Sequence, residues 1–268
     1  MRLRSCLLLL AVCLFMTGCL QAIPNDPRLI ESFYQRPENV RIDYQTDKGR
    51  QVAYYLPPSR APEAPPKYLA ILFPGINAIA LGWLPFIDLE ENADTGYLLI
   101  DYPGRGDSEG MMRPEENYRN SEGALRALAQ HFGLKRLPAR LSLLGHSFGT
   151  GAALQFASRQ PVESIVLVAP FNDLKRAVRQ TSFLLAFLMP SQIDNRELLK
   201  EILGRSSPPR ISILHGDRDQ TLPVTMGADL AAVAPEQIDF YRFAEDGHVN
   251  ILTRRRQLIF SSLNGWSP

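Results

Sequence analysis

Cysteine is scarce in this sequence, and all of it lies at one end. The 268 residues include three cysteines, Cys6, Cys13 and Cys19. A chain beginning at Cys19 would keep one thiol and could form no internal disulfide. The folded part must therefore rely on an ordinary hydrophobic core, for which a hydrophobic fraction of 45% is sufficient.

An excess of charge of either sign is also missing. The chain has 29 basic and 28 acidic residues, a net charge of +1, and no basic arm. This balance argues against nucleic acid as a partner. The sequence also lacks a P-loop and an H-E-x-x-H motif, and its four histidines do not cluster as zinc ligands. We therefore predict that the protein needs neither a metal nor an organic cofactor.

Long apolar runs are lacking as well. Arg2 and Arg4 precede an apolar run from Cys6 to Met16, which is too short for the roughly 20 residues of a membrane-spanning helix. Basic residues, an apolar stretch and small residues in this order are typical of a secretory signal peptide.

The residues that follow resemble the lipobox of bacterial lipoproteins, in which a cysteine is acylated and becomes the first residue. The stretch reads Met16-Thr17-Gly18-Cys19, with Met in place of the usual Leu. The resemblance implies a signal peptide over residues 1–18 and a lipid on Cys19, and multiple acylation anchors a protein stably. Leu20 rather than Asp follows the cysteine. By resemblance to enterobacterial lipoprotein sorting, this implies the outer membrane, facing the periplasm, rather than the inner membrane of a bacterial envelope.

Residues 19–38 contain three prolines and are predicted to be a tether. We expect one domain over residues 39–268, beginning with a hairpin whose strands, Val40–Tyr44 and Gln51–Leu56, flank the turn Asp47-Lys48-Gly49.

Short apolar runs then alternate with helix-like stretches, which predicts an α/β fold. Because the runs are continuous rather than alternating, we expect a mostly parallel central sheet buried on both faces, with helices on each side. The strand candidates are 68–73, 97–102, 141–144, 164–169, 211–214 and 238–243. The helix candidates are 121–132, 148–159, 196–203, 223–233 and 249–263.

One connection, over about residues 171–209, is long enough to be a helical cap. Phe183 and Phe187 from this cap, together with Trp83, are predicted to line an apolar acyl pocket. The alternative is that these residues pack on one another as the cap's own core.

The strand at 141–144 runs into Gly145-His146-Ser147-Phe148-Gly149, a G-x-S-x-G motif followed by a helix rich in small residues. A sharp strand-to-helix turn would lift the Ser147 hydroxyl above the sheet as a nucleophile. Both flanking glycines are needed because side chains at these positions would collide with neighbours.

A serine hydroxyl needs a general base. Of the four histidines, His131 lies on a helix, His146 adjoins the serine and points elsewhere, and His215 is expected to pack in a loop. His248, in a turn after the last strand, is the predicted base.

The base in turn needs a carboxylate that orients it. Asp217 and Asp219 follow one strand, and Asp173 follows the strand before it. Spacing does not choose between them, although the order Ser, Asp, His suits this kind of fold.

From about Tyr68 to His248 the chain resembles the α/β-hydrolase superfamily, and within it the esterase, lysophospholipase and serine aminopeptidase-like group. That group typically has H-G-x-x-D-x-x-V-P, which His215-Gly216, Asp219 and Pro223 match in register, with Leu222 for Val. The resemblance assigns the acid to Asp219. The stretch Asp101–Gly110 similarly resembles the group's D-x-x-G-x-G-x-S-x-G turn.

An oxyanion hole requires two backbone N–H groups. Phe148, directly after the nucleophile, is expected to provide one. The other is expected from Ile76, in the loop Phe73-Pro74-Gly75-Ile76, which resembles the family's H-G turn with Pro74 in place of His.

We therefore expect a serine hydrolase that acts on carboxylic esters, of acyl or lysolipid type, through an acyl-enzyme intermediate. The expected partners are a small-molecule ester or lipid and, through Cys19, a membrane. An amidase, peptidase or thioesterase with the same triad, and a non-catalytic envelope binding protein on this scaffold, are the alternatives.

Overall fold

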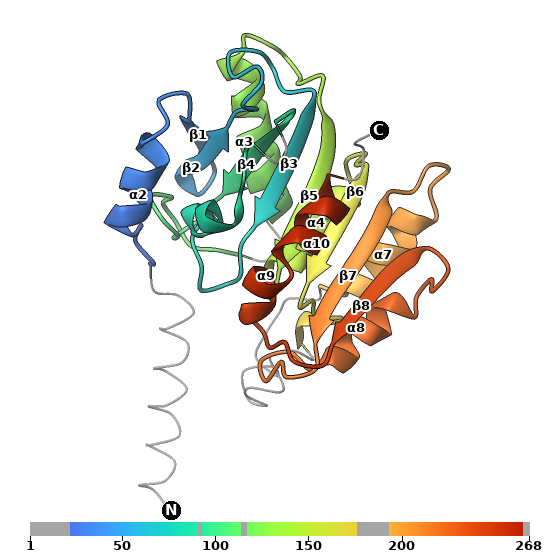
Figure 1. Ribbon diagram of the computed structural model, residues 1–268. Helices are drawn as coiled ribbons and strands as arrows, with labels where there is room; N and C mark the ends of the chain where they lie inside the picture. Colours follow the sequence, from blue (N-terminus) through green and yellow to red (C-terminus); the bar gives the residue numbers. More distant parts are fainter. Residues whose placement is uncertain (1–21, 91–92, 114–116, 176–192, 265–268) are drawn as a thin grey trace, which may run out of the picture.

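An eight-stranded sheet forms the centre of the computed structural model, which describes residues 22–90, 93–113, 117–175 and 193–264 (Figure 1). The strands are β1 (Val40–Thr46), β2 (Gly49–Leu56), β3 (Tyr68–Phe73), β4 (Thr95–Ile100), β5 (Arg140–His146), β6 (Ser164–Val168), β7 (Arg210–Gly216) and β8 (Ile238–Phe243). The hairpin β1–β2 is antiparallel and joins β4 antiparallel, whereas all other neighbouring strands are parallel. The predicted α/β fold with an N-terminal hairpin at one edge is confirmed.

The order of the strands reverses beside β3. The order is β1-β2-β4-β3-β5-β6-β7-β8, so the chain leaves β3 toward one edge for β4 and crosses to its other side for β5. Open α/β sheets bind ligands at such a point, beyond the carboxyl ends of the strands. This topology places a candidate ligand site at the loops that follow β3 and β5.

Both faces of the sheet are covered, as the continuous apolar runs predicted. Along β3, Leu69, Ile71 and Phe73 belong to one core cluster, and Ala70 and Leu72 belong to the other. The first face carries α3 (Asn117–His131), α4 (Gly149–Ala157), α7 (Asn195–Leu203) and α8 (Val224–Ala231). The second carries α2 (Pro27–Tyr34), the 3-10 helix η1 (Ala80–Phe86), α9 (Asn250–Arg254) and α10 (Arg256–Leu263).

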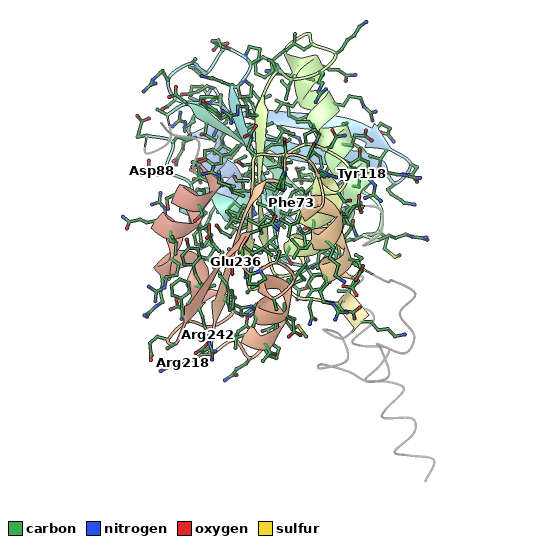
Figure 2. The ribbon with its side chains drawn as sticks, turned by 90° about the vertical axis from the view of Figure 1, so that its right-hand side faces the viewer. Phe73, Asp88, Tyr118, Arg218, Glu236 and Arg242 are labelled. Atoms are coloured by element: carbon green, nitrogen blue, oxygen red, sulfur yellow. The ribbon has the colours of Figure 1, made fainter. Side chains whose placement is uncertain are left out.

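The side-chain view shows the same division between core and periphery. Phe73 lies in the interior, whereas Arg218 and Arg242 lie at the edge of the molecule (Figure 2). Phe73 is fully buried, and both arginine side chains are exposed. None of the helices in the part of the chain that the structure describes is both long and apolar enough to cross a membrane.

Several segments differ from the sequence prediction. β4 covers Thr95–Ile100 rather than 97–102, and α3 begins at Asn117 rather than 121. Two further segments differ in kind. The expected single helix over 249–263 is divided at Arg255, whose φ of −113° and ψ of 17° interrupt the helical path. The described part of the expected tether, residues 22–38, is folded against the domain. Asp26 caps α2, Pro27 occupies its first turn, where a missing N–H costs nothing, and Phe33 is fully buried. The limits of signal peptide, tether and cap stay predictions.

Candidate active site

Ser147 lies at a sharp turn between β5 and α4. Its φ of 55° places a non-glycine residue in the left-handed region, which is strained. A Cβ on Gly145 would lie 2.5 Å from the carbonyl oxygen of Gly149, and one on Gly149 would lie 2.2 Å from that of Phe73. Glycine is therefore required on both sides of Ser147, as the motif predicted.

The side chains of Ser147, His248 and Asp219 form one hydrogen-bonded chain. The Ser147 hydroxyl donates to His248 Nε2 at 2.9 Å, and His248 Nδ1 donates to Asp219 Oδ2 at 2.7 Å. The three residues follow β5, β8 and β7, so they meet at the carboxyl edge of the sheet. The structure thus brings together the residues that the sequence predicted as nucleophile, base and acid.

The Asp219 carboxylate is buried and well supplied with donors. Its Oδ1 accepts from the backbone N–H of Thr221 and of Leu222, both at 2.8 Å. Burial alone would raise the pKa of Asp219, but hydrogen bonds from His215, His248 and Leu222 outweigh it and hold this pKa well below its usual range. Asp219 therefore stays ionised at neutral pH and can orient the imidazole.

Sequence reasoning missed the role of His215. Its side chain is fully buried, and Nε2 lies 2.9 Å from the Leu222 carbonyl oxygen and 3.2 Å from Asp219 Oδ2. Both partners accept, so Nε2 carries the proton. The signal was its position four residues before Asp219, although the sequence indicated loop packing alone.

His146 does not contact the Ser147 hydroxyl, as predicted. Its Nε2 donates to the backbone carbonyl oxygen of His248 at 2.8 Å. Burial, followed by the charge of His248, lowers the pKa of His146 to about 4. A neutral His146 therefore fixes the backbone that carries His248.

The two other acidic candidates lie outside this chain of hydrogen bonds. Asp217 binds the exposed Arg242, at 2.5 Å between Oδ1 and Nε. Asp173 forms an isolated backbone bridge with Asp194. Asp217 therefore pairs at the surface, whereas the buried Asp219 is the carboxylate that meets His248.

Phe148 and Ile76, the residues predicted to supply oxyanion donors, both adjoin the surroundings of Ser147: Phe148 follows it in the chain, and Ile76 follows Gly75. Gly75 lies so close that an added Cβ would be 3.6 Å from Ser147 Cβ. The N–H groups of Phe148 and of Ile76, next to Gly75, have no hydrogen-bond acceptor among the described residues. Unpaired donors beside a serine are what an oxyanion hole needs.

Of the three residues predicted to line the acyl pocket, the structure describes Trp83. Trp83 is 3% exposed and packs edge-to-face on Phe86 within a core cluster, with 6.1 Å between ring centroids. Phe183 and Phe187 lie outside the described residues, as does Cys19. The pocket and the lipidated cysteine stay predictions.

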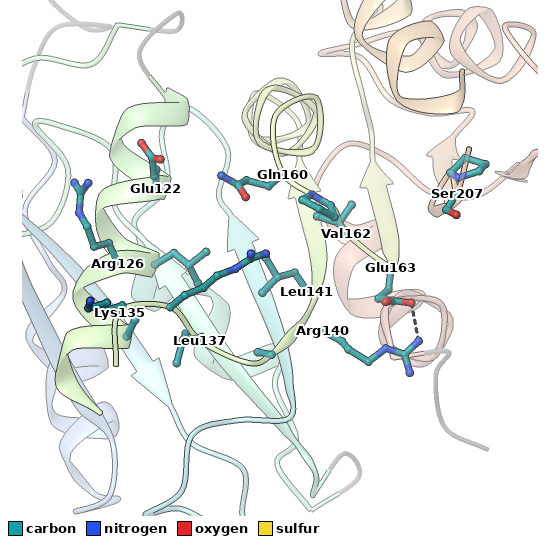
Figure 3. Close-up of a pocket in the computed structure, with 16 residues that line it drawn as sticks. Glu122, Arg126, Lys135, Leu137, Arg140, Leu141, Gln160, Val162, Glu163 and Ser207 are labelled. Atoms are coloured by element: carbon teal, nitrogen blue, oxygen red, sulfur yellow. Dashed lines mark hydrogen bonds and ion pairs between the residues drawn. The ribbon is translucent and has the colours of Figure 1, made fainter. Parts of the chain in front are cut away.

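A cavity of about 650 Å³ lies at the end of the sheet opposite Ser147, and Figure 3 shows the residues that line it. Its lining includes Arg140 and Leu141 at the start of β5, and Arg140 pairs with Glu163 at 2.7 Å. This cavity cannot serve the Ser147 hydroxyl, which lies beyond the other end of β5. Across the described parts of the chain, no three His, Cys, Asp or Glu side chains are placed to share a metal ion.

Asp101, just after β4, provides a pH-dependent prediction about stability. Its carboxylate is fully buried and accepts from the N–H of Ala80 at 2.7 Å. Burial raises the pKa of Asp101 to about 7; the Ala80 hydrogen bond opposes this rise, and the charge of Asp107 adds to it. The unfolded chain releases this proton near pH 4, whereas the folded protein keeps it until about pH 7. The stability contributed by Asp101 therefore falls as pH rises through this window.

Asp101→Asn removes the titration and keeps an oxygen that can accept from Ala80. Between pH 5 and pH 8 the free energy of unfolding of the wild type should fall relative to the variant, on the order of 2 kcal/mol. Urea unfolding of both proteins at each pH measures this difference. A difference that stays constant across pH contradicts the prediction.

Known proteins resemble this chain in sequence. A family model described as the alpha/beta hydrolase family matches residues 70–259. The human protein ABHD12B is 29% identical over 161 residues, which are 53% of this chain and 43% of that protein, so the match spans less than half of the human protein.

Two solved structures show the same fold. An esterase from Pyrococcus furiosus, Pf2001, superposes with a TM-score of 0.69 and 14% identity, covering 92% of this chain and 97% of its own. An alpha-beta hydrolase from Vibrio vulnificus has a TM-score of 0.66 and 17% identity, covering 88% and 85%.

Proposed function

Because this chain belongs to the alpha/beta hydrolase family, we propose that it is a serine hydrolase that cleaves carboxylic esters with Ser147, His248 and Asp219 as its triad. One observation carries the proposal. The Ser147 hydroxyl, the His248 imidazole and the Asp219 carboxylate form an unbroken chain of hydrogen bonds at the carboxyl edge of the sheet.

The reaction follows from this arrangement. His248 Nε2 takes the hydroxyl proton while Ser147 Oγ attacks the ester carbonyl carbon, and the Asp219 carboxylate stabilises the imidazolium that forms. The N–H groups of Phe148 and Ile76 bind the negative carbonyl oxygen of the tetrahedral intermediate. When this collapses, the C–O bond breaks and His248 gives its proton to the departing alcohol. His248 then activates a water molecule, which releases the acid and restores Ser147.

For the substrate we propose an ester with an apolar acyl chain, of acyl or lysolipid type. The predicted pocket of Trp83, Phe183 and Phe187 would hold the acyl chain. Each methylene buried there should raise kcat/KM about fourfold, from about 0.8 kcal/mol.

A panel of p-nitrophenyl esters from acetyl to palmitoyl tests this substrate class. We expect kcat/KM to rise with chain length until the pocket is full. The anilide and the thioester of the best acyl group are the controls. Equal rates for short and long esters would refute the acyl pocket, and cleavage of the anilide without the ester would refute an esterase.

We further propose that the protein is anchored to a bacterial membrane, at its outer membrane facing the periplasm, through a lipid on Cys19. The motif Met16-Thr17-Gly18-Cys19 after a signal-like segment supports this. The variant Cys19→Ser should move the protein from the membrane fraction to the soluble periplasmic fraction on cell fractionation. Cys13→Ser, within the apolar run, is the matched control and should leave the distribution unchanged. Membrane association of Cys19→Ser equal to that of wild type contradicts lipid anchoring.

A further inference from the structure

The loop between β3 and η1, residues 74–79, carries the Ile76 N–H and is held from outside by one short stretch. Tyr102 Oη donates to the Pro74 carbonyl oxygen at 3.0 Å, and Arg105 Nε donates to the Ile76 carbonyl oxygen at 3.0 Å. Asp101 Oδ1 accepts from Ala80, where the loop enters η1. Three side chains that follow β4 thus fix the beginning, the middle and the end of this loop.

Of these three side chains, that of Arg105 contacts Ile76 itself. It is 2% exposed, which is rare for an arginine, and Nη1 also donates to its neighbour's carbonyl oxygen, that of Gly104, at 3.2 Å. A buried guanidinium must use its donors, so these carbonyls are held firmly. Two backbone dihedrals separate the carbonyl of Ile76 from its own N–H. Fixing the carbonyl therefore restricts where the N–H can point.

The turn that carries Arg105 is itself clamped by the N-terminal segment. Ile23 N donates to the Gly104 carbonyl oxygen at 3.2 Å, and Gly106 N donates to the Ile23 carbonyl oxygen at 2.7 Å. Gly104 and Gly106 have φ values of 77° and 56°, which other residues adopt at a cost. The bridge between Ile23 and Arg105 therefore fixes the backbone from which the guanidinium extends.

We propose that Arg105, held in place by the N-terminal segment around Ile23, is the positioning residue of the oxyanion loop. It touches no reacting atom and acts through the Ile76 backbone, so it sets how well the Ile76 N–H meets the developing oxyanion. This inference rests on the proposed ester hydrolysis. It also links the segment that would emerge from a membrane anchor to the rate of the chemical step.

Substitution of sulfur for the ester carbonyl oxygen gives a readout specific to the oxyanion. Sulfur accepts hydrogen bonds weakly, so a thionoester gains little from the oxyanion donors. In Arg105→Met we expect kcat on the oxygen ester to fall about 10- to 100-fold, since losing one donor costs about 10²–10³. KM should change little. The ratio of kcat for the oxygen ester to kcat for the thionoester should fall by a similar factor, because the sulfur substrate never used the donor fully.

Arg205→Met is the matched control. Arg205 also donates to backbone carbonyl oxygens, those of Ala157, Ser158 and Gln160, but at the far end of α4 and just after it. This variant should lose stability without changing the oxygen-to-sulfur ratio. If Arg105→Met does not fold, Arg105→Lys is the variant to test, because a single ammonium group cannot replace the several N–H donors of the guanidinium. The ratio of kcat for the oxygen ester to kcat for the thionoester should also fall below that of the wild type in Arg105→Lys.

The outcomes separate the two proposals. A folded wild type that hydrolyses neither ester contradicts the proposed function. A wild type that hydrolyses the ester, with an Arg105 variant whose ratio is unchanged, overturns the role of Arg105, whether or not the rates of both substrates fall together.

Discussion

Replacing Ser147 with alanine is expected to lower kcat for an ester about 10⁶-fold, the largest effect of any substitution discussed. The variant keeps the fold, because Ser147 presents its hydroxyl to His248 rather than to the core. It removes the atom that would form the acyl-enzyme, so His248 and Asp219 have no nucleophile to activate. Background hydrolysis at the oxyanion donors should remain, about 10³–10⁴ above the reaction in water.

Two measurements check this result. Steady-state hydrolysis gives kcat, and a fluorophosphonate probe labels an activated serine covalently. We expect labelling of the wild type and none of Ser147→Ala. Ser158→Ala is the matched control, since Ser158 is buried at the other end of α4 and its hydroxyl bonds the Gln155 carbonyl oxygen. A folded wild type that the probe does not label would contradict catalysis by Ser147 and would favour a binding protein on this scaffold.

Replacing Asp219 with asparagine should lower kcat about 10⁴-fold at pH 7. Oδ1 must still accept from the N–H groups of Thr221 and Leu222, so the asparagine amide nitrogen would take the place of Oδ2. That nitrogen donates, whereas His248 Nδ1–H needs an acceptor. The imidazole would then adopt the other tautomer, with its proton on Nε2, and could not take the proton from Ser147.

Asp217→Asn is the control for this variant, since Asp217 lies two residues away and pairs with exposed Arg242. Surface ion pairs of this kind contribute about 0–1 kcal/mol to folding stability. Asp217→Asn should therefore stay folded, with kcat near that of the wild type. Both variants are compared by kcat on one ester and by thermal unfolding. Similar losses of kcat in the two variants would contradict the assignment of Asp219 as the catalytic acid. A greater loss of kcat in Asp217→Asn would assign that role to Asp217 instead.

Agreement between sequence and structure is best where one physical cause acts alone. A continuous apolar run predicted β3 to the residue, because a strand buried on both faces has no polar alternation to obscure its ends. The motif around Ser147 predicted its turn, since Gly145 and Gly149 are demanded by close backbone contacts. Agreement is poorer where polar contacts compete with helical periodicity, as at Arg255, which divides the expected last helix.

The sequence by itself determined the fold class, the nucleophile and the base, because local motifs and a small number of histidines left few alternatives. It left Asp173, Asp217 and Asp219 equally possible until the family resemblance separated them. Tertiary structure alone revealed that His215 donates to Asp219 and that residues near Ile23 clamp the turn of Arg105. Such contacts join parts of the chain whose spacing carries no periodic signal. They arise when the sheet brings strand ends together, and no local pattern encodes which ends will meet.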